Sequence, residues 1–465
     1  MIKFLFLLLF IPCSICAQNF TCDNQNIEDA YNLAVNTMNI NVRRGVLAAG
    51  GDYGGEWVRD IAINSWNCAS LLRPKVAEKS LWSVTKNKDT IGHQYWDRII
   101  WVIAALNHYY VTGDKKFLKQ AYQCSLNSIK QLEEQAFDRN HGLFTGPSVF
   151  NDGIAGYPKP IDDDNIHSTF VLDYPHARYI KCLSTNCIYY EAYLCLIKME
   201  SLLHTDKTQA TIFEKKANKL KENILKNFYN EKENKLYYLV EGNGKIDKYQ
   251  EGLGVSFAIM FGIVNKKQAQ KILQSVQVSN YGITSIYTDF PRFSKDKPGR
   301  HNNLIWPMVN GFFAKASIIA GDRHSFNIEL DGLTHLAIDE DKGDYQFREI
   351  YNPNTGQPFG GWQKGSLTQS CRLQTWSATA YINMVDFGMI GFRFKSNGII
   401  FSPYLPPTIH LLSLKNIRYR NAVLNITVKG NGTIIQSFTV NGKQKKDASI
   451  NDYIRGENNI IIQLI

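Results

Sequence analysis

The segment IIWVIAAL at residues 99–106 is apolar without interruption, and it is followed by Gly113-Asp114 and by a segment with a different pattern. In that second segment large apolar residues recur every three or four positions, which places them on one face of a helix. They are Leu118, Tyr122, Leu126, Ile129 and Leu132. A helix that is apolar on all sides must be covered on all sides, whereas a one-faced helix can lie outside it. The two segments therefore predict an inner helix joined to an outer one.

The same unit returns in LIWPMVNGFFAKASIIA at residues 304–320, which runs into Gly321-Asp322 and another one-faced segment. Glycine is a good helix stop and aspartate a good N-cap, so each Gly-Asp pair ends one helix and begins the next. The theme repeats from Asp23 to about Phe387. We therefore predict a mainly α-helical domain over residues 18–390, with its helices in two concentric rings, an (α/α)6 toroid.

Beyond Gly388 the pattern changes to short β-branched or alternating segments at residues 398–402, 411–419, 422–428, 434–440 and 459–464. Asn-Gly pairs at Asn431 and Asn441 are typical of tight turns between strands. These features predict a small C-terminal β-sandwich over residues 391–465. We expect it to cap the helical domain without a chemical role.

The first residues are typical of a signal peptide. Lys3 is followed by an apolar run over residues 4–12 and by small residues up to Ala17, which suits cleavage after Ala17. Residues 1–17 are therefore predicted to direct the protein to the periplasm or the exterior. A lipid anchor at Cys16 is not expected, because Cys13-Ser14-Ile15 is a poor lipoprotein context. No second apolar stretch is long enough to predict a membrane span.

The composition favours a globular protein with a large core. The chain has 465 residues, of which 44% are hydrophobic, and a net charge of +10. That charge is spread through Lys-rich outer segments, and no arginine-rich tract or nucleic-acid motif accompanies it. We therefore interpret the basic residues as a solvated surface and expect no nucleic-acid partner.

Cysteine usage does not indicate a metal site. Seven cysteines follow the signal segment; Cys182 and Cys187 are close enough in sequence for a local bridge, but an odd count favours mostly buried thiols. The one Cys-x-x-Cys, Cys13 to Cys16, lies in the signal segment, and there is no His-Glu-x-x-His. Neither a metal nor another cofactor is predicted.

In a helical toroid the loops that lead into the inner helices surround the pocket, so polar and aromatic clusters there are functional candidates. The first is Gly54-Gly55-Glu56-Trp57-Val58-Arg59-Asp60. An indole can stack on a pyranose ring while a fixed carboxylate accepts from its hydroxyls, which favours a sugar site. The alternative is a helix cap with a neighbouring ion pair.

The second candidate is the loop at residues 142–158, which is crowded with Gly, Pro and aromatic residues and has Asp152 as its only acid. An isolated carboxyl among apolar residues is expected to have a raised pKa, as a general acid requires. The alternative is an aspartate that only hydrogen-bonds the turn.

The third candidate combines Glu251, in Gln250–Gly254, with His301, Asn302 and Trp306, in Arg300–Pro307. Both segments precede apolar helices. Glu251 is the rival acid or a capping residue, and His301 has the alternative of a structural loop histidine.

The fourth candidate is Phe347–Gly356, followed by Gly360-Gly361-Trp362 and Thr375-Trp376-Ser377-Ala378. Here Glu349 is flanked by Arg348, which is expected to keep the carboxylate ionised, and an Asn-Pro-Asn-Thr-Gly turn follows. An ionised carboxylate suits a general base.

These motifs together resemble the six-hairpin glycosidases, over roughly residues 25–390. The resemblance rests on Trp57-x-Arg59-Asp60, the loop around Asp152, and Glu349-x-Tyr351-Asn352-Pro353-x-Thr355-Gly356 with Trp376-Ser377-Ala378. It is closest to the mannosylglycerate hydrolase-like, processing α-glucosidase and trehalase group. That resemblance implies an inverting hydrolase with Asp152 as acid and Glu349 as base. The implied sugar-binding residues are Trp57, Arg59, Asp60, His301 and Trp306, and Glu251, Asn302 and Trp362 are added as candidates by position.

The predicted function is therefore exo-acting, inverting hydrolysis of α-linked glucose- or mannose-containing oligosaccharides. Inversion requires two carboxyl groups about 6.5 to 9.5 Å apart. Two alternatives stay open. A polysaccharide lyase on a similar toroid would use Tyr, His and Arg or Asn on an acidic uronate. A non-catalytic glycan-binding protein would need only tryptophans such as Trp57, Trp306, Trp362 and Trp376.

Overall fold

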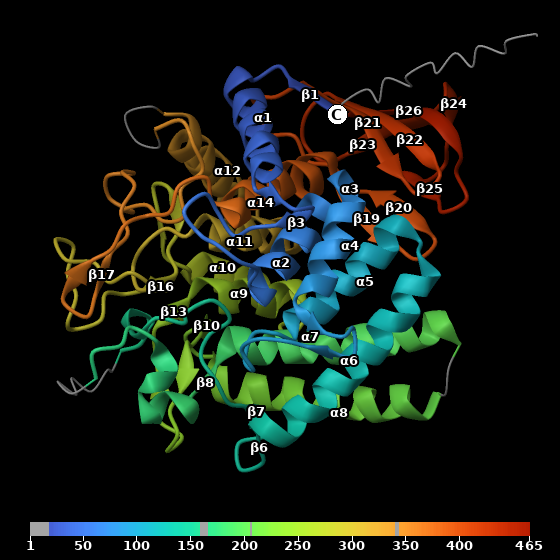
Figure 1. The fold of residues 1–465 in the computed structure, drawn as a ribbon. Helices are drawn as coiled ribbons and strands as arrows, with labels where there is room; N and C mark the ends of the chain where they lie inside the picture. Colours follow the sequence, from blue (N-terminus) through green and yellow to red (C-terminus); the bar gives the residue numbers. More distant parts are fainter. Residues whose placement is uncertain (1–17, 159–165, 205–206, 340–343) are drawn as a thin grey trace, which may run out of the picture.

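The computed structural model describes residues 18–158, 166–204, 207–339 and 344–465 (Figure 1). The predicted signal peptide, residues 1–17, lies outside the described residues. The architecture is mainly helical with a strand-rich C-terminal part, as predicted. No helix among the described residues is long and apolar enough to cross a membrane.

Six helices contact one another in cyclic order, the last closing on the first. They are α2 (Val58–Asn64), α5 (Ile100–Thr112), α7 (Leu183–Leu203), α9 (Gly252–Met260), α11 (Pro307–Ala320) and α14 (Thr375–Asn383). Most residues of these helices are buried. We refer to them as the inner helices.

A second set of helices packs on the outside of the inner helices, each against one or two of them. They are α1 (Gln25–Ile40), α4 (Pro74–Ser83), α6 (Lys115–Ala136), α8 (Lys207–Phe228), α10 (Lys266–Ser275) and α12 (Arg323–Ile338). In α6 the buried residues include Leu118, Tyr122, Ile129 and Leu132 of the predicted apolar face. The alternation of wholly apolar and one-faced helices is therefore confirmed.

The Gly-Asp pairs act as predicted. Gly113 and Gly321 end α5 and α11 in the left-handed conformation, at φ of 72° and 87°, which favours glycine. Asp114 accepts from the backbone N–H groups of Lys116 and Phe117 at the start of α6, and Asp322 caps α12 in the same way. Each pair thus reverses the chain from an inner to an outer helix.

Each connection from an outer helix back to an inner helix contains a short hairpin whose two strands are two residues long. These are β2/β3 (Val42–Arg43, Val46–Leu47), β4/β5 (Thr85–Lys86, Thr90–Ile91), β6/β7 (Phe137–Asp138, Leu143–Phe144), β9/β10 (Tyr229–Asn230, Lys235–Leu236), β14/β15 (Val278–Ser279, Gly282–Ile283) and β17/β18 (Trp362–Gln363, Ser366–Leu367). Further short strands in these loops are β8 (Lys181–Cys182), β11 (Leu239–Val240), β12 (Ile246–Asp247), β13 (Gln250–Glu251) and β16 (Ile286–Tyr287). The loops lie on one side of the helices and the C-terminal strands on another (Figure 1).

Two π-helices extend inner helices beyond their C-terminal ends. The segment η1 (Ser65–Ala69) follows α2 directly and leads into the short α3 (Ser70–Leu72), and η5 (Met384–Ile390) follows α14. Short 3-10 turns, η2 (Ile154–Gly156), η3 (Val171–Asp173) and η4 (Pro175–Arg178), occur in the long loop before α7.

The C-terminal part contains a three-stranded and a six-stranded sheet. The first has the order β19-β20-β25, and the second has the order β1-β21-β22-β26-β23-β24. Their strands are β19 (Phe392–Lys395), β20 (Gly398–Phe401), β21 (Leu411–Tyr419), β22 (Ala422–Lys429), β23 (Ile435–Val440), β24 (Lys443–Gln444), β25 (Ser449–Asn451) and β26 (Gly456–Leu464). Neighbouring strands are antiparallel except β22 and β26, which are parallel. Ring pairs such as Phe401–Phe438 join the two sheets.

The edge strand β1 (Asn19–Cys22) comes from the other end of the chain. It pairs antiparallel with β21, from Asn19 opposite Lys415 to Cys22 opposite Leu412 (Figure 1). Phe20 is buried there against Tyr31 of α1, with ring centroids 4.2 Å apart. The sequence analysis did not anticipate this pairing, because a four-residue strand gives no local signal of its partner.

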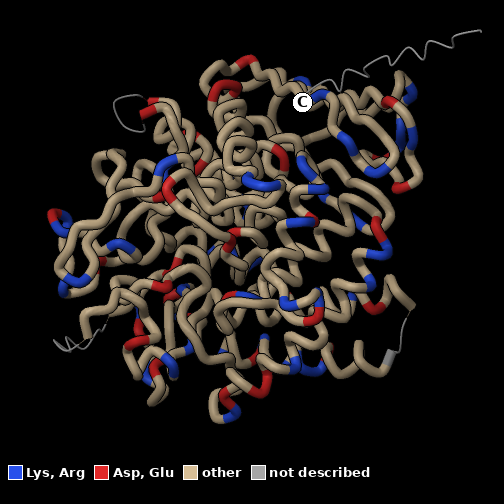
Figure 2. Tube along the Cα trace, in the orientation of Figure 1, with Lys and Arg blue, Asp and Glu red and all other residues tan. Residues whose placement is uncertain are grey.

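Two predictions about the surface and the thiols can also be compared with the structure. Lys and Arg are interspersed with Asp and Glu along the described chain, as expected for a solvated surface (Figure 2). The seven cysteines among the described residues are free, and all but Cys22 are buried. Cys182 and Cys187 therefore do not form the local bridge, and the prediction of buried thiols is confirmed.

Candidate active site

The predicted site residues lie at the beginning of inner helices or in the loops that lead into them. Trp57 immediately precedes α2, and Arg59 and Asp60 occupy its first turn. Asp152 lies in the loop between β7 and α7, and Glu349 in the loop between α12 and α14. Because the inner helices share one direction relative to these loops, residues far apart in sequence meet at one end.

Arg59 is the centre of a buried ion-pair cluster with three aspartates. Its guanidinium nitrogens lie 2.7 Å from Asp152 Oδ2, 3.4 Å from Asp97 Oδ2 and 3.7 Å from Asp60 Oδ2. Burial raises the pKa of Asp60 to about 7 and that of Asp97 to about 8 despite Arg59. The charges of Glu349 and Asp152 raise the pKa of Asp60 further. Asp60 is therefore close to both proposed catalytic carboxylates.

Asp152 is the most exposed of these carboxylates, with 28% of its side chain accessible. Burial raises its pKa, but the positive charges of Arg59 and Arg300 and the hydrogen bond from Arg59 outweigh burial and hold the pKa below its usual value. The prediction of a raised pKa is thus wrong for the free protein. The surrounding loop is apolar as expected, but the arginine that contacts Asp152 comes from 93 positions earlier in the chain.

Glu349 is held by three donors and is nearly inaccessible, with 4% of its side chain exposed. Arg300 Nη2 lies 2.7 Å from Oε2, the Tyr53 hydroxyl donates to Oε1 at 2.8 Å, and the backbone N–H of Cys371 donates to Oε2 at 3.3 Å. All three contacts suit a carboxylate.

The cation beside Glu349 is not the one predicted. Arg348 pairs with Asp344 and donates to the carbonyl of Ser370. Neighbouring side chains along this loop leave the backbone in different directions, so adjacency in sequence did not bring Arg348 to the carboxylate. Arg300, from the loop before α11, occupies that place.

Comparison with known proteins identifies the family. The family model of the mannosylglycerate hydrolase MGH1-like glycoside hydrolase domain matches residues 57–377. This range contains Asp60, Asp97, Asp152 and Glu349, which we refer to as the carboxylate cluster. The chain belongs to this glycoside hydrolase family. It is therefore a glycosidase that hydrolyses O-glycosyl bonds, and neither the lyase nor the non-catalytic binding protein is supported. Residues 392–447 match the C-terminal domain of glycosyl hydrolase family 65.

Solved structures share the fold of this glycosidase at low sequence identity. A GH63 mannosylglycerate hydrolase from Thermus thermophilus, in complex with glucose, is 14% identical with a TM-score of 0.60, covering 76% of this chain and 99% of its own. A GH78 family rhamnosidase from a Bacillus species is 13% identical with a TM-score of 0.63, covering 96% of this chain and 44% of its own. No curated protein sequence gave a significant match.

In this glycosidase His301 lies beside Asp152, and Trp306 packs against His301. His301 Nε2 lies 3.6 Å from Asp152 Oδ1, and its ring stacks on Trp306 with centroids 4.9 Å apart. Burial lowers the pKa of His301 to about 3, so the ring is neutral near neutral pH. Trp306 is only 2% exposed and donates from Nε1 to the carbonyl of Arg300. Trp306 therefore holds His301 by stacking and Arg300 by this hydrogen bond, and its ring has almost no surface exposed to solvent.

Glu251 and Asn302 have contacts outside the cluster. Glu251 is completely buried, accepts from the N–H of Ser184 at the start of α7, and has its pKa raised to about 7 by burial. Asn302 accepts from the N–H of Phe290 and donates to the carbonyl of Thr288. Glu251 therefore caps the N-terminal end of α7, as one of its two predicted roles requires. Asn302 holds the loop that follows β16 through its two hydrogen bonds.

Two tryptophans of the glycosidase keep exposed ring surface. Trp57 is 41% exposed at the start of α2. Trp362, on the β17/β18 hairpin, is partly exposed, and Lys297 Nζ lies 4.9 Å from its ring centroid.

Tyr53 and Asp97 belong to the site but were not predicted from the sequence. Tyr53 immediately precedes Gly54, the first residue of the first candidate motif, so extending that motif by one residue would have included it. Asp97 belongs to Trp96-Asp97-Arg98, directly before the apolar run, and resembles Trp57-x-Arg59-Asp60 in composition and position. A comparison of the two helix starts would have found it. Among the described residues no group of His, Cys, Asp or Glu is arranged to hold a metal ion.

Proposed function

We propose that this glycosidase is exo-acting and inverting, and that its substrates are α-linked glucose- or mannose-containing oligosaccharides. Asp152 acts as the general acid and Glu349 as the general base that deprotonates water. The observation that supports this proposal best is the meeting of two carboxylates, each held by its own arginine, at one end of the inner helices. The negative charges of Glu349 and Asp152 both raise the pKa of Arg300, which supports one shared site for the two carboxylates.

The two carboxylates differ in a way that suits these roles. Glu349 is enclosed and accepts three hydrogen bonds, which hold its carboxylate in one orientation. A carboxylate fixed in this way suits a general base that takes a proton from water. Asp152 is partly exposed, and a sugar that covers it would remove the water that stabilises its charge. Substrate binding is therefore expected to raise the pKa of Asp152 toward the value that an acid needs.

The remaining side chains supply the proposed sugar subsite. The exposed ring of Trp57 offers a stacking surface, and Trp362 offers a second on the β17/β18 hairpin. Arg59, Asp60 and His301 are proposed to bind sugar hydroxyls. We also propose that the two sets of helices form an (α/α)6 toroid, which the cyclic contacts of the inner helices support.

The choice of sugar draws on the similar structures. One is a mannosylglycerate hydrolase in complex with glucose and another a rhamnosidase, so rhamnosides belong in the substrate panel as the contrasting case. We further propose that residues 1–17 are a signal peptide and that the mature enzyme is secreted or periplasmic. Strand β1 begins at Asn19, so cleavage after Ala17 would leave the six-stranded sheet complete. N-terminal sequencing of the exported protein tests this.

Product stereochemistry tests the mechanism. A panel of α-glucosides, α-mannosides and α-rhamnosides is screened for turnover, and hydrolysis of the best substrate is followed by NMR. First release of the β-anomer supports inversion, whereas first release of the α-anomer contradicts Glu349 as a base acting through water. Azide should partly restore turnover to Glu349→Ala and give a β-configured azide, because a small anion can replace the attacking water.

A binding measurement separates catalysis from substrate recognition. Asp152→Asn and Glu349→Gln should each lose most turnover while sugar binding stays measurable, because Trp57 and Asp60 are unchanged. Loss of binding together with turnover would instead place these carboxylates among the recognition residues.

A further inference from the structure

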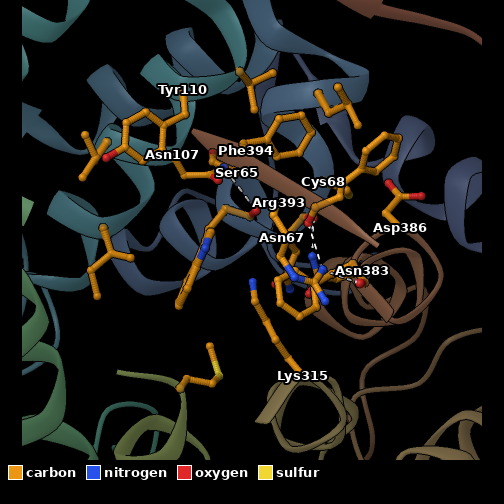
Figure 3. A pocket seen from close by; sticks show the side chains of 18 of the residues that line it. Ser65, Asn67, Cys68, Asn107, Tyr110, Lys315, Asn383, Asp386, Arg393 and Phe394 are labelled. Atoms are coloured by element: carbon orange, nitrogen blue, oxygen red, sulfur yellow. Dashed lines mark hydrogen bonds between the residues drawn. The ribbon is translucent and has the colours of Figure 1, made fainter. Parts of the chain in front are cut away.

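A cavity lies near the C-terminal ends of the inner helices, whereas Asp60 of the proposed active site lies at the N-terminal end of α2. Figure 3 shows the side chains that line this cavity. Its volume is about 240 Å³, and its walls come from α5, α7, α11, the two π-helices and β19. Asp60 is at the start of α2, whereas Trp66, in the π-helix that continues α2, lines the cavity. None of the residues proposed for catalysis or sugar binding lines it.

Two positive side chains meet in this cavity around the ring of Phe387. Lys315 Nζ lies 4.5 Å from the ring centroid of Phe387 and 4.7 Å from that of Trp66. The guanidinium carbon of Arg393 lies 3.5 Å from the Phe387 centroid. Within the described part of the chain, no carboxylate forms an ion pair with Lys315 or Arg393. Burial and the charge of Arg393 lower the pKa of Lys315 to about 7.

The two acidic residues in the walls already have partners, and the partner of Glu191, Lys198, lines the same cavity. Glu191 pairs with Lys198 at 3.1 Å, and Asp386 accepts from the hydroxyl of Tyr31 at 3.1 Å. Burial raises the pKa of Asp386 to about 7, which further reduces its negative charge. Lys315 and Arg393 are half-buried, and the only hydrogen bonds of Arg393 among the described residues are to the backbone carbonyls of Phe387 and Phe392. A half-buried cation without a counter-charge is only partly hydrated, so the cavity favours an added anion.

The walls also have features of a binding site besides charge. The π-helices η1 and η5 both line the cavity, and local π-helical turns inside α-helices often occur at functional sites. Asn107 and Asn383 also line the cavity, where their amide groups donate to the carbonyls of Trp66 and Asn67 in η1 at 3.3 and 2.8 Å (Figure 3). Aromatic faces next to amides and cations can bind a ring that has polar substituents and one negative group.

We propose that this cavity binds a small anionic molecule, whose carboxylate or phosphate group lies between Lys315 and Arg393 and whose body packs on Trp66. The volume is below the roughly 300 to 1,000 Å³ of pockets for drug-sized ligands, so the ligand is of monosaccharide size or smaller. The site is separate from the proposed active site and does not depend on its assignment.

Binding of three probes to the full protein tests the proposal: glucuronate, inorganic phosphate and uncharged glucose. Glucuronate or phosphate should raise the melting temperature and give a measurable Kd by calorimetry, because a ligand that binds only the folded state stabilises it. Lys315→Met should weaken this binding roughly tenfold or more, since a charge-assisted contact is lost. Lys315→Arg should retain most of it.

Further variants provide the controls. Lys226→Met, at an exposed position in the last turn of α8, should leave anion binding unchanged. Asn107→Asp places a negative charge in the wall with little change in shape and should also weaken binding, which covers the case that Lys315→Met folds poorly. Glycoside turnover and any binding of glucose should be the same in Lys315→Met as in the parent. Equal affinity for glucuronate and phosphate in the parent, Lys315→Met and Asn107→Asp would overturn the proposal, as would no binding of either anion.

Discussion

Tyr53→Phe removes a single oxygen atom from the proposed active site. The lost hydroxyl donates to Glu349 Oε1 at 2.8 Å and accepts from Arg300 Nη2 at 3.1 Å. Glu349 keeps its 2.7 Å contact with Arg300 and the N–H of Cys371. The variant therefore measures what one hydrogen bond contributes to the orientation of the proposed base while the ion pair remains.

The expected magnitude follows from the charge of the acceptor. A hydrogen bond to a charged group contributes about 1.5 to 3 kcal/mol, and about 1.4 kcal/mol corresponds to a factor of ten in rate. If that contribution orients Glu349 toward the attacking water, kcat should fall roughly 10- to 150-fold. KM should change less than about threefold, because Trp57 and Asp60 are untouched.

The assay is steady-state kinetics on the best α-glycoside across the pH range. Tyr404→Phe is the matched control, since its hydroxyl donates to the neutral amide of Asn327 at 3.1 Å away from the cluster. In a Glu349→Gln background Tyr53→Phe should cause little further loss. An unchanged kcat in Tyr53→Phe would refute the assignment of Glu349 as a base positioned by Tyr53.

Three further predictions concern protonation and the sheet. The alkaline limb of kcat should lie at higher pH than that of kcat/KM, because the pKa of Asp152 is low in the free enzyme and should rise under the substrate; coincident limbs would contradict Asp152 as the acid. Burial raises the pKa of Glu329 to about 8, so the folded protein keeps a proton that the unfolded chain loses near pH 4.5. The free energy of unfolding should therefore fall as the pH rises from about 4.5 to about 8 and level off above it. The melting temperature of Glu329→Gln should therefore fall less over that range than that of the parent. Phe20→Ala should cost about 3 to 5 kcal/mol of unfolding free energy without changing kcat or KM, and an unchanged melting temperature would show that β1 is not an integral part of the sheet.

Features set by local pattern were predictable from the sequence alone. The apolar run at residues 99–106 and the one-faced segment after Gly113-Asp114 specify an inner and an outer helix, because helical periodicity and capping act over a few residues. Trp57-x-Arg59-Asp60 could be placed at a helix start for the same reason. The strand-rich C-terminal part was likewise visible in its alternating segments.

Only the tertiary structure decided which charges meet. Arg59 reaches Asp152 across 93 positions and lowers its pKa, where the local apolar loop alone predicted the opposite. Glu349 takes Arg300 as its partner and not the adjacent Arg348, because a contact depends on the direction of each side chain and not on its place in the sequence. The pairing of β1 with β21 has the same origin. Contacts between distant segments depend on the closed arrangement of all the helices and strands, which no local window of sequence contains.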